Sequence, residues 1–497
     1  MRDGAQNPFV RFTTEGKLEA THVLDELGVD YIEGGFPQAG GHCDYFSKVK
    51  DTTEAKIAAF GMTPRTYDFD NDPSMKALLD TDADVITLVV KTPEPQIRRV
   101  LGKSPRVYRA IAGDAIRYLK SLGKEVVVDA EHFFDEYKRS PGSAMALLDE
   151  CGDADWLVLC DTNGGAMYRD VSGVVRDVIR EVGDRVGVHF HNDRGLALAN
   201  TLKAAYAGAR HLQVTMNGMG ERTGNANLVE VVGNLYDKGF GIEAEPHKLT
   251  DASRSMEKLS GWSMTPNAPF VGRLAFSHSG GMHSDAMLKW QKSYEHAEPG
   301  TFGNERAFPI SGQSGRAAIT MKLSQWGYDM DKNHPVVRGL LDDIGGMGYV
   351  GDAQFYLMFS RYDSSYHDPI EIESMRVTDN ITSGGSNPEA VVRFRSNGRR
   401  FYEVSEGEGQ VDALDSALRK ALRRVHPEID DVKLLSYTVP PITGTGADAS
   451  VQVRVYFGNN GDRWDSMKEG TDIIAASADA LLDAYRFFLL RQEDKNR

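Results

Sequence analysis

The sequence predicts an α/β protein built on a TIM (β/α)8 barrel whose first strand is apparently missing, followed by helical linker subdomains and a C-terminal α+β domain of duplicated βββα. The first observation is that short apolar runs alternate with amphipathic segments over residues 1–245, as they do where helices connect the strands of a parallel sheet. The second is that residues 366–497 repeat one order of elements, three strands and then a helix. Residues 246–365, which lie between these regions, carry mainly helical patterns.

Seven stretches in the first region have the length and composition of strands. They are 30–34, 55–61, 84–91, 125–131, 156–162, 186–191 and 211–217. Helices are predicted between them at 15–27, 106–122, 143–151, 168–182 and 196–207. A closed barrel of this kind has eight strands, and residues 2–6 read as a loop leading towards a helix. The strand that would come first is therefore placed ahead of Met1, and Arg2 and Asp3 are expected at a frayed terminus.

The C-terminal duplication is read from two matching series. The first has strands at 369–377, 390–395 and 400–404 and a helix at 411–424. The second has strands at 432–439, 450–457 and 463–467 and a helix at 473–490. We therefore predict three regions: a barrel domain over 1–245, helical linker subdomains over 246–365, and a C-terminal domain over 366–497.

Composition narrows the class of function. The 497 residues are 41% hydrophobic and 26% charged, as in ordinary folded domains, and the formal net charge of -15 argues against a general nucleic-acid binder. No apolar run is long enough to predict a membrane span. The three cysteines, Cys43, Cys151 and Cys160, are too widely spaced for a disulfide framework or a zinc site. We expect a cytoplasmic protein that binds small molecules.

Two histidines, His189 and His191, stand two residues apart in a predicted strand. Side chains alternate between the two faces of a strand, so both imidazoles would leave the same face and could reach one metal ion. A half-buried strand that carries two exposed histidines explains the pair equally well. Other ligands must therefore decide between these two interpretations.

Those ligands are predicted at the carboxyl ends of the strands, where the active sites of such barrels lie. Barrel closure would bring the last strand, which leads into residues 217–225, beside both the histidine strand and the start of the chain. Asp3 and this loop would then surround the same point as His189 and His191. Two imidazoles with carboxylate or amide oxygens suit Mg²⁺, Mn²⁺ or Zn²⁺ with positions open for a ligand. With Arg2 beside it, such a site suits an oxygen-rich chelating ligand such as a 2-oxo acid.

Several motifs stand in order along the chain. They are residues 2–6 (RDGAQ), 129–135 (DAEHFFD), 159–165 (LCDTNGG), 189–193 (HFHND), 217–227, 280–283 (GGMH) and 303–306 (GNER). On these motifs the chain resembles the 2-isopropylmalate synthase and homocitrate synthase superfamily, the DRE-TIM metallolyases, over essentially its whole length. Within that superfamily the closest resemblance is to the long-form (R)-citramalate synthases.

The resemblance implies roles for particular residues. The implied divalent-metal ligands are Asp3, His189, His191 and Asn225. The implied substrate-binding residues are Arg2, Thr162 and Gln6, and Arg2 would also polarise the keto group. Glu131 would lie in the catalytic centre, and His283 would be delivered from the partner subunit. The two would help deprotonate the methyl group of acetyl-CoA. No tyrosine near Asn304 matches one that some relatives use beside this histidine.

The implied reaction is a Claisen-type condensation of acetyl-CoA with pyruvate, giving (R)-citramalate and CoA for isoleucine biosynthesis. The resemblance also implies a homodimer whose C-terminal domain binds an effector, isoleucine. One alternative is a larger 2-oxo acid, as in a 2-isopropylmalate or homocitrate synthase. A lyase on the same barrel is disfavoured by the C-terminal duplication. A catalytically impaired homologue that only binds an effector is the remaining alternative.

Overall fold

A computed structural model describes the whole chain except residues 40–42, 279–280, 383–384, 444–448, 460–461 and 497. It divides into two compact units. The first comprises Met1–Phe276 with Ala297–Arg306, and the second Ser277–His296 with Ala307–Arg497. Among the described residues, no helix combines the length and the apolar character needed to cross a membrane.

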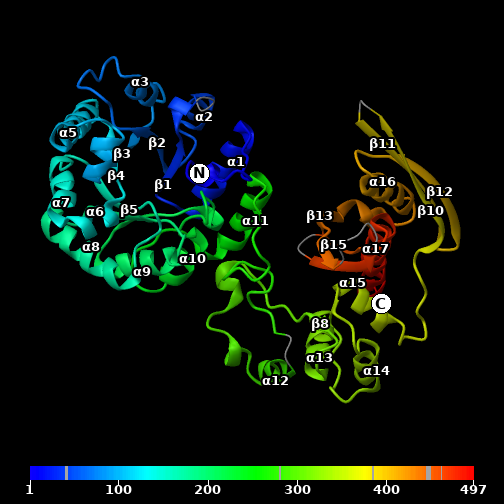
Figure 1. The fold of residues 1–497 in the computed structure, drawn as a ribbon. Coiled ribbons are helices and arrows are strands. Elements are labelled where there is room, and N and C mark those ends of the chain that lie inside the picture. Colours follow the sequence, from blue (N-terminus) through cyan, green and yellow to red (C-terminus); the bar gives the residue numbers. More distant parts are fainter. Residues whose placement is uncertain (40–42, 279–280, 383–384, 444–448, 460–461, 497) are drawn as a thin grey trace. The chain divides into compact units, whose positions relative to one another are not determined.

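The first unit is built on a seven-stranded parallel sheet whose strands follow one another in sequence order. The strands are β1 (Tyr31–Gly35), β2 (Lys56–Met62), β3 (Val85–Lys91), β4 (Glu125–Glu131), β5 (Trp156–Asp161), β6 (Val186–Phe190) and β7 (His211–Gln213). The sheet is curled, with helices along its outer side (Figure 1). The predicted barrel-type α/β fold is confirmed, and every predicted strand is present within a few residues of its expected bounds.

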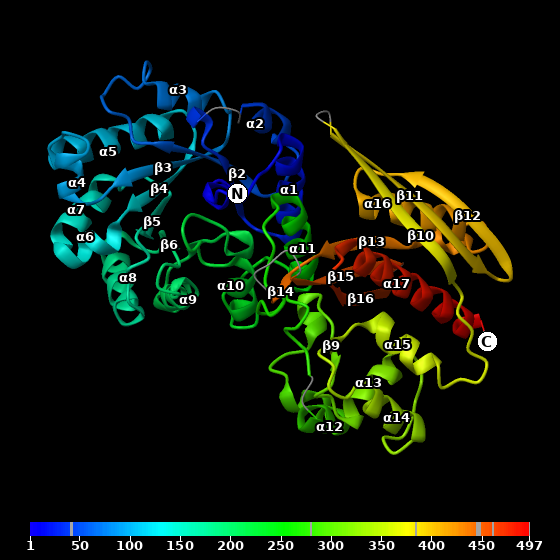
Figure 2. The same ribbon diagram turned by 45° about the vertical axis from the view of Figure 1, so that its right-hand side comes forward.

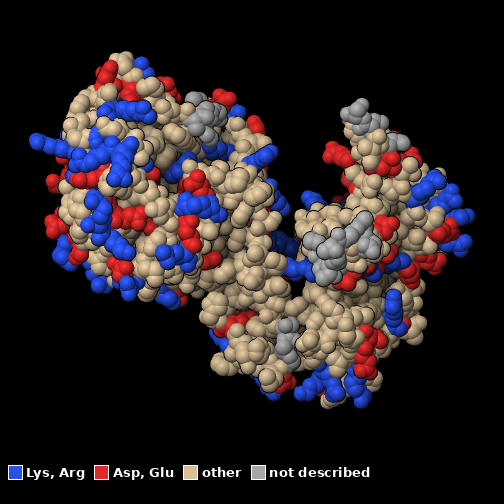
Figure 3. All heavy atoms as spheres, in the orientation of Figure 1, with Lys and Arg blue, Asp and Glu red and all other residues tan. Residues whose placement is uncertain are grey.

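The helices of this unit mostly connect consecutive strands. They are α1 (Thr14–Leu27), α2 (Cys43–Val49), α3 (Pro73–Leu79), α4 (Glu94–Arg99), α5 (Pro105–Ser121), α6 (Phe133–Arg139), α7 (Pro141–Glu150), α8 (Tyr168–Val182), α9 (Ala197–Ala207), α10 (Leu228–Leu235) and α11 (Leu249–Ser260). On the surface in Figure 3, acidic and basic side chains are interspersed over this unit.

The strand predicted over 211–217 is shorter than expected. It ends at Gln213, and Met216–Gly218 form a 3-10 turn, η3, in which Asn217 has a left-handed φ of 59°. Met216 is buried in a cluster beside the sheet, so apolar residues that read as strand continue as a packed loop. β1 and β7 are the two edges of the sheet, and a cavity of about 790 Å³ is lined by residues of both.

The start of the chain is anchored, contrary to the expected frayed terminus. Asp3 is only 7% exposed, and the backbone N–H of Arg2 donates to the Glu33 carbonyl on β1 at 3.2 Å. Residues Gly4–Gln6 then form a 3-10 turn, η1. The prediction failed because it considered only the absent strand pairing and not this backbone hydrogen bond and turn.

Helices dominate the middle of the chain, as predicted. Its elements are α12 (Gly281–Lys289), η5 (Gln291–Tyr294), η6 (Pro299–Phe302), β8 (Ile310–Ser311), α13 (Arg316–Gln325), α14 (Pro335–Asp343), β9 (Tyr349–Val350) and α15 (Asp352–Ser360). The two short strands pair antiparallel with each other.

The C-terminal region contains the predicted duplication. The first copy is β10 (Glu371–Thr382), β11 (Gly385–Ser396), β12 (Arg399–Glu406) and α16 (Gln410–Leu422). The second is β13 (Lys433–Thr438), β15 (Ser450–Asn459), β16 (Asp462–Gly470) and α17 (Ile473–Asn496), with a short extra strand β14 (Pro441–Thr443). In both copies the middle strand pairs antiparallel with the other two.

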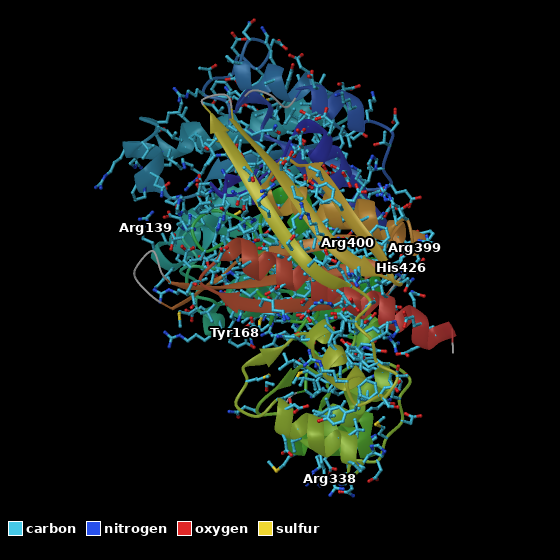
Figure 4. The ribbon with its side chains drawn as sticks, turned by 90° about the vertical axis from the view of Figure 1, so that its right-hand side faces the viewer. Arg139, Tyr168, Arg338, Arg399, Arg400 and His426 are labelled. Atoms are coloured by element: carbon cyan, nitrogen blue, oxygen red, sulfur yellow. The ribbon has the colours of Figure 1, made fainter. Side chains whose placement is uncertain are left out.

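Each sheet is covered by a helix, as the apolar alternation of the strands requires (Figure 2). Leu414 and Leu418 of α16 are fully buried in one cluster with Val392 and Phe394 of β11. At the turn between β11 and β12, Arg399 and Arg400 begin the next strand (Figure 4). Along β11 the exposed Arg393 and Arg395 alternate with the buried Val392 and Phe394, so one face of this sheet carries charged side chains and the other faces the core.

Candidate active site

Three ionisable side chains converge at the carboxyl end of the sheet in the first unit. Asp3, His189 and His191 are buried and each offers an atom within 4.8 Å of the others. The Nε2 atoms of the two histidines are 3.3 Å apart, and Nε2 of His189 is 3.5 Å from Asp3 Oδ2. Alternation along β6 places both imidazoles on one face, so the interpretation of two exposed surface histidines is wrong.

Asn225 reaches the same place through a loop that pairs with the end of β6. Asn225 forms an isolated antiparallel bridge with His191, and its Nδ2 donates to the Met219 carbonyl at 3.0 Å. A Cβ atom at Gly220 would lie 2.3 Å from Asn225 Nδ2, so only glycine allows this close approach. Gly220 thus leaves room for the Asn225 amide, and the Met219 carbonyl holds it.

The free atoms of these side chains fit a divalent cation. Asp3 Oδ2 and Asn225 Oδ1 are buried and have no hydrogen-bond partner among the described residues. Buried polar oxygens are nearly always paired, and an unpaired one costs about 1–3 kcal/mol. Two such oxygens next to two imidazole Nε2 atoms form a mixed N/O donor set that Mg²⁺, Mn²⁺ or Zn²⁺ would satisfy.

Electrostatics favour the protonation states that metal binding requires. Burial lowers the pKa of His191 to about 4, helped by His189, and burial also lowers the pKa of His189. Burial alone would raise the pKa of Asp3, but Arg2 and the two histidines hold it below its usual value. The site therefore presents neutral imidazoles and a carboxylate at neutral pH.

Arg2 is held beside this donor set by several contacts. Its Nε donates to Glu33 Oε2 at 2.8 Å and its Nη1 to Asp3 Oδ1 at 3.1 Å. The guanidinium carbon lies 3.7 Å from the centroid of the Phe60 ring. Gln6 is exposed, and its Oε1 lies 3.5 Å from Arg2 Nη1. No hydrogen bond between described residues uses Arg2 Nη2, so this donor is left for a ligand.

Thr162 and Glu131, the other predicted residues of this unit, lie at the ends of β5 and β4. The hydroxyl oxygen of Thr162 accepts from the backbone N–H of His132 at 2.8 Å. Among the described residues nothing receives the proton of this hydroxyl, so it can donate to a ligand. Glu131 accepts from Lys91 Nζ at 2.5 Å and keeps about a quarter of its side chain exposed, at 23%.

Sequence reasoning missed Gln213 and the polar contacts it makes in the interior of the sheet. Gln213 on β7 has its Oε1 3.0 Å from His189 Nδ1, and its Nε2 donates to Asp129 on β4 at 2.7 Å. Burial, with Glu33 nearby, raises the pKa of the Asp129 carboxyl. Asp129 begins the 129–135 motif, but nothing in the local sequence links it to Gln213.

His283 belongs to the second unit, on α12, and is exposed. Its ring stacks on Tyr294 with centroids 4.2 Å apart. Tyr294 belongs to the 3-10 turn η5 that follows α12, and the sequence did not predict its contact with His283. Gly280, the first residue of the His283 motif, lies outside the described residues.

Three family profiles match successive parts of the chain. The HMGL-like profile matches residues 1–256, the homocitrate synthase post-HMGL domain-like profile residues 270–338, and the LeuA allosteric (dimerisation) domain profile residues 349–489. The last range covers the first copy of the duplication and the second copy up to residue 489 in α17. The division into three regions at the predicted boundaries remains a prediction.

Curated relatives match along nearly the full chain. The (R)-citramalate synthase of Sulfolobus acidocaldarius is 37% identical over 98% of this chain and 95% of its own length. That of Aquifex aeolicus is 35% identical over 100% of this chain and 97% of its own length. Among solved structures, the HMG-CoA lyase of Bacillus subtilis aligns with a TM-score of 0.46 at 20% identity, covering 52% of this chain and 90% of the lyase.

Proposed function

The chain belongs to the HMGL-like family, with (R)-citramalate synthases as full-length relatives, and on this premise we propose that it condenses acetyl-CoA with pyruvate to give (R)-citramalate and CoA. A carbon–carbon bond forms between the acetyl methyl carbon and the keto carbon of pyruvate, and water then hydrolyses the thioester. The observation that carries this proposal is the convergence of Asp3, His189, His191 and Asn225 beside Arg2.

The four converging residues would hold Mg²⁺ or Mn²⁺, with Zn²⁺ as the third candidate, because the donor set mixes nitrogen and oxygen and contains no thiolate. When bound, the divalent ion supplies Lewis acidity to the keto group of the substrate.

Arg2 and Thr162 would bind the 2-oxo acid. Arg2 Nη2 donates to the keto oxygen as negative charge develops there, while Glu33 and Asp3 keep the guanidinium in position. The Thr162 hydroxyl, whose oxygen is already oriented by the His132 N–H, donates to the carboxylate of pyruvate. Gln6, next to Arg2, adds an amide at the exposed side.

Proton removal from acetyl-CoA needs a base, and we assign it to Glu131 together with His283 of the partner subunit. Glu131 forms an ion pair with Lys91, which holds its carboxylate in position. The exposed position of His283 and its stacking on Tyr294 support a role in which the ring meets a second molecule. This assignment requires a homodimer.

We further propose that the C-terminal duplication, residues 366–497, dimerises and binds isoleucine as an effector. The match of the LeuA allosteric (dimerisation) domain profile to residues 349–489 supports this assignment. The buried free thiols of Cys151 and Cys160 fit a reducing cytoplasm, where we place the protein.

The test is release of free CoA from acetyl-CoA in the presence of Mn²⁺ and a panel of 2-oxo acids. We expect release with pyruvate, and loss of that release on chelation and in the His191→Ala variant. Faster release with 2-oxoisovalerate or 2-oxoglutarate would instead assign the 2-isopropylmalate or homocitrate synthase reaction. Release with none of these acids would leave the effector-binding homologue.

A further inference from the structure

A line of three polar side chains crosses the interior of the curled sheet and ends on His189. Asp129 lies on β4, Gln213 on β7 and His189 on β6. Gln213 Nε2 donates to Asp129 Oδ1 at 2.7 Å, and its Oε1 lies 3.0 Å from His189 Nδ1. Since β4 and β7 are not neighbours in the sheet, Gln213 spans the interior between them.

The direction of the hydrogen bonds among these three side chains determines the tautomer of His189. With its Nε2 turned to Asp129, Gln213 presents an amide oxygen to the imidazole, and an amide oxygen only accepts hydrogen bonds. His189 must therefore carry its proton on Nδ1, which leaves the lone pair on Nε2. A flipped amide would place its oxygen against Asp129 Oδ1, and the two oxygens could then share a hydrogen bond only if Asp129 carried a proton.

The lone pair so exposed belongs to the atom that faces the candidate metal position. His189 Nε2 is the atom near both Asp3 Oδ2 and His191 Nε2. His191 Nδ1, by contrast, has no hydrogen-bond partner among the described residues. Of the two imidazole rings, it is therefore His189 that is oriented by a hydrogen bond at Nδ1, the one to Gln213.

We propose that Gln213 is a positioning residue that holds His189 in its metal-binding tautomer and, as a neutral spacer, biases the site toward Mg²⁺ or Mn²⁺ over Zn²⁺. A carboxylate bonded directly to a ligating imidazole makes the ligand more basic. Stronger nitrogen donation favours the later divalent metals of the Irving–Williams order, such as Zn²⁺. Here the carboxyl group of Asp129 is kept one side chain away from the imidazole. The inference rests on the proposed metal-dependent function.

The experiment compares the unchanged full-length chain with Q213L and with the exchange D129N/Q213E, all freed of metal by chelation. Q213L removes both hydrogen bonds. The exchange keeps both of them and nearly the same volume, but moves the carboxylate next to the imidazole. Dissociation constants for Mn²⁺ and Zn²⁺ are measured by competition with a chelating dye, and thermal unfolding of the metal-free chains checks the fold. Q452L is the matched control, because Gln452 makes a similar 2.9 Å bond to Glu469 in the second unit.

We expect Q213L to weaken Mn²⁺ binding about 10- to 100-fold, which is the usual effect of removing a residue that hydrogen-bonds to a metal ligand. D129N/Q213E should recover Mn²⁺ binding and shift the preference toward Zn²⁺ by about tenfold or more. Q452L should change neither constant. Unchanged Mn²⁺ binding in Q213L would overturn the positioning role, and an unchanged metal preference in D129N/Q213E would overturn the role of the neutral spacer.

Nitrogen NMR of the metal-free chain, labelled at its 13 histidines, reads the tautomer without any metal. The His189 signal, identified by its absence in H189N, should report Nδ1–H in the unchanged chain and a mixture of tautomers in Q213L. A proton on Nε2 in the unchanged chain would overturn the inference. If the unchanged chain binds neither metal, the proposed function fails, and this spectrum still decides whether Gln213 sets the tautomer.

Discussion

Replacing Arg2 by lysine tests the centre of the proposed mechanism. Arg2 uses Nε for Glu33 and Nη1 for Asp3, which leaves Nη2 for the substrate oxygen. A lysine ammonium is a single centre on a flexible stem and cannot keep the planar, forked geometry of these contacts. The charge remains, but the donor aimed at the developing oxyanion is lost.

The expected magnitude follows from that geometry. Loss of one preorganised oxyanion donor costs about 100- to 1,000-fold in kcat, or roughly 3–4 kcal/mol of transition-state stabilisation. The contact of the Arg2 guanidinium with the Phe60 ring at 3.7 Å adds about 0.5–2 kcal/mol to stability. The Arg2→Lys variant should therefore also unfold at a moderately lower temperature. The KM for acetyl-CoA should change little, because Arg2 contacts only the 2-oxo acid in this mechanism.

The assay is CoA release at saturating pyruvate and Mn²⁺, with Mn²⁺ affinity measured separately. Arg11→Lys is the matched control, because Arg11 is exposed and no role in binding or catalysis is assigned to it. A kcat within about threefold of the unchanged chain, at equal Mn²⁺ occupancy, would refute the role of Arg2 as an oxyanion donor.

Three other changes probe the rest of the chain. His283→Ala should abolish turnover while leaving Mn²⁺ binding intact, since only proton removal needs this ring; calorimetry and CoA release measure the two, and normal turnover would contradict the assignment. Isoleucine should raise the unfolding temperature of the full-length chain, and an absence of any shift with isoleucine, leucine or valine would count against an amino-acid effector. Burial lowers the pKa of His211 to about 4, so the folded chain should lose up to about 3 kcal/mol as the pH falls from about 6.5 to about 4. His211→Gln should lessen this loss in urea unfolding, and an unaltered pH dependence would contradict the buried neutral histidine.

The architecture could be predicted from the sequence because local patterns determine most of it. Alternation of apolar runs and amphipathic segments placed the strands, and period-two spacing placed His189 and His191 on one face of β6. The rule that neighbouring strand ends of a barrel lie close together also placed Asp3 beside the two histidines. The rule holds here although the sheet has seven strands, because it concerns only adjacent strand ends. The roles of these residues remain predictions.

The features that were missed depend on long-range contacts. Gln213 contacts Asp129 across the sheet interior, and no spacing in the sequence encodes that distance. Tyr294 reaches His283 only because a 3-10 turn reverses the chain after α12. β7 ends at Gln213 although the apolar pattern continues to Met216, the buried first residue of η3.

The position of Asp3 shows how a ligand can be preorganised without a strand of its own. The Arg2 backbone is tied to β1 at Glu33, and the Arg2 side chain links Glu33 to Asp3. The backbone N–H of Gln6 donates to the Asp3 carbonyl at 3.1 Å, which closes the turn on the other side. Because one residue supplies both the anchor and the proposed oxyanion donor, the carboxylate and the guanidinium keep a fixed separation. In the proposed mechanism, Glu33 therefore positions both the Asp3 carboxylate that would bind the metal and the Arg2 donor that would polarise the substrate, although Glu33 itself contacts neither metal nor substrate.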